Sequence, residues 1–200
     1  MQFNTYDVLS SLIHGVVVTG FALTLYDITF TDYSTLFFLS ISFCVGYLIN
    51  GIGSWCQDWL FWLMGGKPTE RILTKKEGCS YSGTNHIRFY FSAEILDMLK
   101  SELNESDASI SKYAARMCQH FVLDENSRIK DFNASYAFAR SLIITTTLIA
   151  GMVLSVYYDK FIAYFVLALP ILCFFRCKDR AFHYAKEVAT QYYHKVKSQS

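Results

Sequence analysis

The sequence predicts an all-α membrane protein with four transmembrane helices and a mainly helical cytoplasmic cap. Its 200 residues are 52% hydrophobic and include only two prolines, and their mean hydropathy of +0.23 is high for a water-soluble domain. The apolar residues are gathered into blocks, the longest of which exceed the ~20 residues that cross a bilayer core. The positive charges are gathered outside those blocks, which favours a multi-pass protein with one preferred orientation.

Residues 1–66 are expected to form a first transmembrane hairpin, with spans at about 8–26 and 34–54. The second half of this hairpin carries no charged side chain from Tyr33 until Asp58. A helix of that length can cross the hydrocarbon core and continue into the membrane interface.

Small and polar side chains lie at helical spacing in both spans. Gly15 follows Ser11 by four residues in the first span, and Ser42, Gly46 and Asn50 recur at intervals of four in the second. This spacing lets helix backbones approach closely in lipid, where packing replaces the hydrophobic effect as the driving force. We therefore expect one packing face on each helix.

Residues 55–64 are expected to lie in the cytoplasmic membrane interface. Trp55, Trp59 and Trp62 are spaced i, i+4, i+7, with Asp58 among them. Indole rings are enriched at headgroup depth, and a salt bridge or headgroup contact is the favoured role for Asp58. The Gly-Gly pair that follows, with a proline two residues later, predicts the end of this helix.

Residues 67–140 are polar and mixed in charge, and they predict the cytoplasmic helical cap. Its clearest helices are expected over residues 92–103 and 109–121, because apolar side chains recur there at helical spacing.

Residues 141–175 are expected to form a second transmembrane hairpin, with spans at about 141–158 and 161–175. One unbroken helix over all of them would be about 50 Å long, so a reversal is expected at Asp159-Lys160. Residues 176–200 predict an amphipathic helix that lies against the cap.

Charge predicts the orientation of these spans. Eleven of the 18 lysines and arginines lie between Lys67 and Arg140, six lie between Arg176 and Lys197, and Lys160 is the remaining one. Positively charged residues tend to stay on the cytoplasmic side of a membrane. We therefore expect a multi-pass protein of the cell inner membrane with both termini in the cytoplasm.

One spacing suggests an enzyme. Arg176 and His183 are separated by six residues on an expected helix, which resembles the catalytic motif of HEPN ribonucleases. A lipid-modifying activity near Asp58 is a second enzymatic alternative. No cofactor is expected, because the sequence holds no phosphate-binding glycine loop or hydrolase motif, and its dispersed histidines and cysteines predict no metal site.

Transport is a further alternative, since polar groups inside a membrane are often functional. His14 and Asn50 are the strongest candidates within the first two spans. They can pack helices within one chain, or they can line a pore in a homo-oligomer.

The sequence also resembles small membrane proteins of bacterial phage defence. The segments that carry the resemblance are YDVLSSLIHG, GYLINGIGSW, GGKP and FFRCKDRAFHYAKEVATQYY. They are similar to four-span inner-membrane proteins of phage-defence loci and to the accessory membrane proteins of type VI-B CRISPR systems. Such proteins imply a membrane-resident regulator or effector of a cytoplasmic nucleic-acid-targeting partner.

The favoured hypothesis is a non-enzymatic, oligomeric membrane protein whose cap receives a partner and couples it to the bilayer, for instance by forming a pore. Its expected partners are lipid, other copies of the chain and a cytoplasmic protein. Direct sequence-specific nucleic-acid binding is not expected, because the net charge is only +1.

Overall fold

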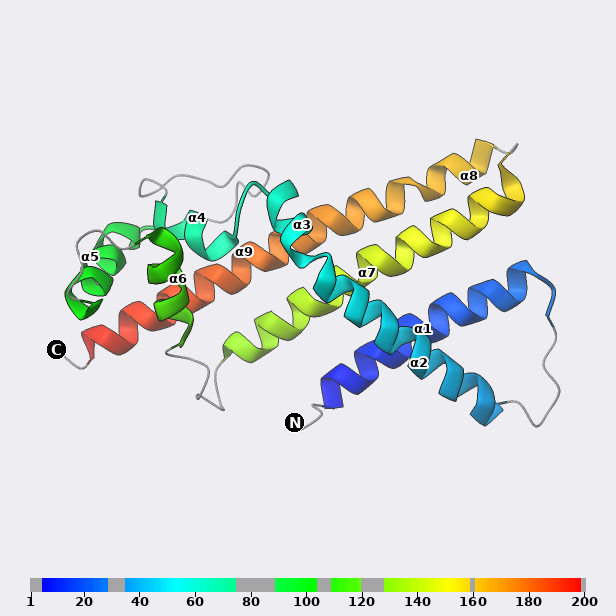
Figure 1. Cartoon of the computed structure of the whole chain (residues 1–200), viewed down its shortest axis with the longest axis horizontal. Helices are drawn as coiled ribbons and strands as arrows, with labels where there is room; N and C mark the ends of the chain where they lie inside the picture. The colour runs from blue at the N-terminus through cyan, green and yellow to red at the C-terminus, as the bar shows by residue number, and fades with distance from the viewer. Residues whose placement is uncertain are drawn as a thin grey trace. The chain divides into compact units, whose positions relative to one another are not determined.

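The protein is helical wherever the structure describes a regular element (Figure 1). This computed structural model describes residues 5–28, 35–74, 89–103, 109–119, 128–158 and 161–198, with the backbone alone at residues 5–7, 162 and 163. The helices in these ranges are α1 (Thr5–Leu25), α2 (Thr35–Trp55), α3 (Gln57–Leu63), α4 (Pro68–Thr74), α5 (Ser92–Leu103), α6 (Ile110–Gln119), α7 (Arg128–Tyr157), α8 (Phe161–Val166) and α9 (Ala168–Lys197). The all-α prediction is confirmed.

Three of these helices are long and apolar enough to cross a membrane, namely α1, α2 and α7. The first two match the expected spans to within three residues at each end. The expected fourth span, 161–175, is not among the three, and the reversal expected at Asp159-Lys160 lies outside the described residues.

Helix α7 runs across the expected boundary between cap and span. The helix begins at Arg128, so the transition expected at residues 140–141 falls inside it. Residues 128–140 contain neither glycine nor proline, and a change from polar to apolar side chains does not interrupt a helix.

Helix α9 runs across a second expected boundary. Residues 161–175 and 176–197 were expected to be separate, but α9 runs without a break from Ala168 to Lys197. The interruption lies instead at Leu167, between α8 and α9. Pro170 explains its place, because proline is tolerated in the first turn of a helix but breaks a helix interior.

The chain divides into two compact units. Unit 1 comprises Met1–Gln57 and Ala137–Cys177, and unit 2 comprises Asp58–Tyr136 and Lys178–Ser200. Helices α7 and α9 contribute residues to both units. The expected cap began at Lys67, whereas unit 2 begins at Asp58 and so includes α3.

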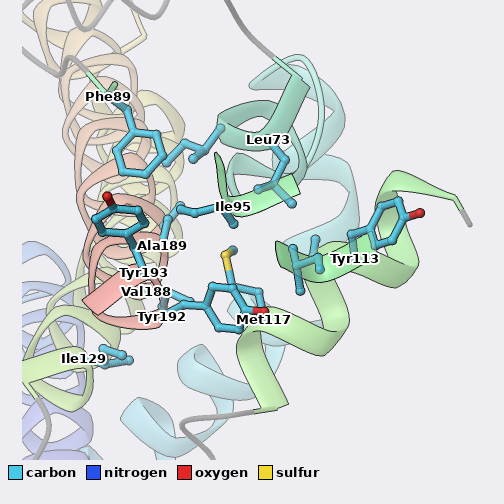
Figure 2. Close-up of a cluster of buried hydrophobic side chains, with 14 of the residues drawn as sticks. Leu73, Phe89, Ile95, Tyr113, Met117, Ile129, Val188, Ala189, Tyr192 and Tyr193 are labelled. Carbon is cyan, nitrogen blue, oxygen red and sulfur yellow. The ribbon is translucent and has the colours of Figure 1, made fainter. Parts of the chain in front are cut away.

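Unit 2 has a core of large apolar side chains, shown in Figure 2. Phe182, Ala185, Val188, Ala189 and Tyr192 form a buried stripe along α9. They pack against residues of α4, α5 and α6, and Phe89, Ile129 and Tyr193 complete the cluster. Its members from those three helices are Ile72, Leu73, Ile95, Leu99, Tyr113, Ala114 and Met117.

Charged and hydroxyl groups join the helices around this core. The Tyr192 hydroxyl donates a hydrogen bond to Glu102 Oε2 at 2.8 Å. Arg116 Nε donates to Oε1 of the same carboxylate at 2.8 Å. On the other side of α6, the Ser111 hydroxyl donates to Glu70 Oε1. These bonds fix α5, α6 and α9 to one another and α6 to α4.

Candidate functional site

Helices α1 and α2 cross with their backbones in close contact (Figure 1). A Cβ atom added to Gly15 would overlap the Ser42 carbonyl and lie 2.9 Å from the Gly46 nitrogen. A Cβ atom added to Gly46 would likewise overlap the Ser11 carbonyl. Only glycine fits at these two positions, so the expected small-residue faces of the two helices do meet.

Asn50 extends this contact to α7. Its side-chain amide donates to the Ser11 hydroxyl at 2.6 Å, and its carbonyl oxygen accepts a hydrogen bond from the Ser141 hydroxyl. One amide therefore joins three helices of unit 1. Both ends of the Asn50 side chain are used within a single chain.

His14 makes a second connection between α1 and α7. Its Nδ1 lies 3.0 Å from the hydroxyl oxygen of Thr145, which is buried. Its ring lies 4.6 Å, centroid to centroid, from the ring of Phe138. His14 is itself only 1% exposed, so its imidazole is enclosed by protein.

A third polar contact lies at the carboxyl end of α2. Arg140 Nη2 donates to the Ser54 hydroxyl at 3.1 Å, and Arg140 Nη1 donates to Gln57 Oε1. The guanidinium therefore lies near the C-terminus of α2, where the helix macrodipole favours a positive charge.

This arrangement is suited to holding helices together. Hydrogen bonds between helices replace bonds to water that lipid cannot offer. Asn50 bonds α1 and α7, so both ends of its side chain have polar partners within one chain. His14 uses Nδ1 to bond α7, whereas its Nε2 is buried without a hydrogen-bond partner among the described residues. The geometry of one chain therefore favours the packing interpretation of Asn50 over pore lining.

Sequence reasoning identified His14, Asn50 and the small-residue faces, but it missed their partners Ser141 and Thr145 on α7. These two residues lie four apart in a largely apolar span that also contains Thr146, Thr147 and Ser155. That spacing places both on one face of a helix and was the available signal.

The corner after α3 is a glycine-based helix end in unit 2. Gly66 N–H donates to the Phe61 carbonyl at 2.8 Å and Gly65 N–H to the Trp62 carbonyl at 3.0 Å, which is the Schellman pattern. Both glycines have positive φ, +85° and +115°, and the predicted helix end is confirmed. Arg71 then donates from Nη1 to the Met64 carbonyl at 2.7 Å.

The guanidinium of Arg71 also lies over the ring of Phe182, 5.6 Å from its centroid. This cation–π contact joins the α3–α4 corner to the core of unit 2. One side chain therefore closes the end of α3 and packs against α9.

The residues expected at the membrane interface are exposed. Trp55 ends α2 in unit 1, and Trp59 and Trp62 lie on α3 in unit 2. Asp58 is exposed in the first turn of α3. Among the described contacts, no ion pair joins Asp58 to Lys67.

Arg176 and His183 lie on one continuous helix, α9. His183 Nε2 lies 3.8 Å from Asp179 Oδ1, and its ring is stacked on that of Phe132 at a centroid distance of 6.4 Å. These contacts account for His183 as a packed residue of unit 2.

The described residues contain no group of three or more His, Cys, Asp or Glu side chains that could hold a metal ion. His86, His120 and Cys79 lie outside the described residues.

No family model, curated protein or solved structure matches this chain.

Proposed function

We propose that the protein is a non-enzymatic, multi-pass inner-membrane protein that couples a cytoplasmic partner to the bilayer. The membrane location is supported by unit 1, where polar side chains are buried between helices and many large apolar side chains are exposed. Of the seven buried polar residues among the described positions, six lie in unit 1: Ser10, Ser11, His14, Ser42, Ser141 and Thr145. Many of its large apolar side chains, including Leu36, Phe37 and Leu48, are exposed. Such a surface is costly in water and suited to lipid.

The exposed hydroxyls of unit 1 agree with a lipid environment. Thr24, Ser40 and Ser155 each donate to a carbonyl three or four residues earlier in their own helix. Their polar atoms are therefore satisfied without water, as a helix in hydrocarbon requires.

We also propose that the chain crosses the membrane four times. The fourth span is the apolar segment formed by α8 and the start of α9, and both termini and unit 2 lie in the cytoplasm. The lysines and arginines support this topology, because 17 of the 18 lie in residues 67–140 and 176–197. An alkaline phosphatase fused after Ser200 should be inactive while a fluorescent protein fused there is bright. An active phosphatase would contradict this topology.

The coupling role is supported by two helices, α7 and α9, that contribute residues to both units. The partner that we propose is a nucleic-acid-targeting protein of a phage-defence system, and the active form is a homo-oligomer. If that form is a pore, vesicles holding the purified protein should leak a trapped dye only when the partner is added.

A phage-infection assay in host cells separates this role from the ribonuclease alternative. His183→Ala should preserve protection, whereas Gly46→Leu, which separates α1 from α2, should abolish it. Loss of protection with His183→Ala, together with RNA cleavage by the purified wild-type chain, would contradict a non-enzymatic role.

A further inference from the structure

The exposed apolar side chains of unit 2 are concentrated on α3. Among the described residues of unit 2, four large hydrophobic side chains are exposed: Trp59, Trp62, Leu63 and Tyr90. Three of the four belong to a helix of seven residues. Trp59 and Trp62 are 59% and 74% exposed, although tryptophan side chains are on average mostly buried.

The opposite side of α3 is firmly attached to unit 2. Leu60 and Met64 are almost completely buried, and the ring of Phe61 is stacked on that of Tyr136. The glycine-based helix end and Arg71 hold the last turn. The two indoles are therefore presented from a fixed helix, and no rearrangement of the core is needed to expose them.

We propose that α3 docks unit 2 on the bilayer interface through Trp59, Trp62 and Leu63. The inference rests on the proposed membrane location of α2. Helix α3 starts two residues after the end of α2, and two residues reach at most about 7 Å. Where α2 leaves the hydrocarbon, α3 must therefore begin within the headgroup region, and indole rings partition into that region.

The chemistry of this face predicts little selectivity for lipid charge. Asp58 is the single formally charged residue of α3, and Lys67 follows its last turn. With no cluster of basic side chains on the helix, contact depends on indole and leucine side chains rather than on anionic headgroups. Phosphatidylcholine alone should therefore support docking, and added salt should not reverse it.

Intrinsic fluorescence can test the proposal, because the three tryptophans of the chain all lie between residues 55 and 62. The full-length protein is placed in phosphatidylcholine nanodiscs, which leave both membrane faces open to solutes. Trp55→Phe/Trp62→Phe leaves Trp59 as the sole reporter, and Trp55→Phe/Trp59→Phe leaves Trp62. The expected result is strong loss of emission with lipids brominated near the headgroup and little loss with aqueous iodide.

The control moves the reporter to the other exposed aromatic residue of unit 2. In a chain with all three tryptophans replaced by phenylalanine, Tyr90→Trp should be quenched by iodide and not by brominated lipid. Quenching of Trp59 and Trp62 by iodide alone would overturn the proposal, because α3 would face water. Protection from both quenchers would also overturn it, because protein would cover the helix.

An alkaline carbonate wash of native membranes distinguishes a failure of the proposed membrane location from a failure of the proposed docking of α3. If the wild-type chain is washed off the membrane, the proposed membrane function fails. If the chain stays in the membrane but its tryptophans are open to iodide, only the docking of α3 fails.

Discussion

Units 1 and 2 differ in the kinds of residue that they bury. Unit 1 holds six of the seven buried polar residues among the described positions and exposes many of its leucines and phenylalanines, although it also buries aliphatic residues such as Ile49. Unit 2 buries leucine, phenylalanine and tyrosine. Burial of large apolar groups stabilises a fold in water but adds little in lipid, which is itself apolar. The difference is the one expected if, as proposed, unit 1 lies in lipid and unit 2 in water. Helix α3 is the part of unit 2 that departs from this pattern, because its large apolar side chains are exposed.

Leucine-to-alanine substitutions should reduce stability far more in unit 2 than in unit 1. Leu99→Ala removes a side chain that is 0% exposed in the core of unit 2, and we expect a loss of about 2–5 kcal/mol in the free energy of unfolding. Leu48→Ala removes one that is 64% exposed in unit 1, and its effect in a bilayer should be small. Thermal unfolding in nanodiscs measures both, and equal losses would contradict the comparison.

Replacing a glycine of α2 by leucine should destabilise unit 1 only where that glycine contacts α1. Gly46→Leu forces a side chain into the Ser11 carbonyl, and overpacking of this kind costs about 1–3 kcal/mol or more. Gly51→Leu is the matched control on the same helix, because nothing lies within 4 Å of a Cβ added there. Cross-linking between cysteines placed on α1 and α2 should fail in the first variant and persist in the second.

The Tyr192–Glu102 hydrogen bond gives unit 2 a pH dependence. Burial raises the pKa of Tyr192 above its ordinary value of 10.0, and the hydrogen bond and negative charge of Glu102 raise it further. The unfolded chain therefore loses this proton first, so the stability from the neutral hydroxyl is complete below pH 10 and declines above it. Tyr192→Phe should cost about 1.5 kcal/mol at neutral pH.

The test of that prediction is chemical denaturation of wild type and Tyr192→Phe across the alkaline range. The difference in the free energy of unfolding should narrow above pH 10, because the variant has no hydroxyl to ionise. A constant difference would show that Tyr192 contributes only by packing.

The smallest expected effect concerns the amide that joins the helices of unit 1. Replacing Asn50 by Ala should cost about 0.6 kcal/mol, and at most about 2 kcal/mol, since interhelical hydrogen bonds in membranes are modest. A double-mutant cycle with Ser141→Ala should reveal coupling between the two sites. Ser40→Ala is the control, because the Ser40 hydroxyl donates within its own helix, and no coupling to Asn50 is expected.

The helical class, the first two spans and the end of α3 could be predicted from sequence because each has a local cause. Hydropathy indicates where a chain prefers lipid, and the positive φ angles at Gly65 and Gly66 require residues without a side chain. The two packing faces, one containing Gly15 on α1 and one containing Gly46 on α2, could be predicted from spacing alone.

The starts of α7 and α9 could not be read from hydropathy, which changes at residue 141 and again at residue 176 while both helices continue. Partners distant in sequence were equally hidden. Ser141 lies 91 residues from Asn50, and Thr145 lies 131 residues from His14. Such pairs depend on how the helices pack, which spacing within one helix does not specify.

Photolabelling of the full-length protein by lipids that carry a diazirine in the acyl chain tests most directly whether the two units occupy two solvents. After irradiation in native membranes and peptide mass spectrometry, the label should be found on the outward side chains of α1, α2 and the later part of α7, including Leu36, Phe37 and Leu48. It should be absent from α5 and α6. Equal labelling of α5 and α6, or no label on α2, would contradict the account.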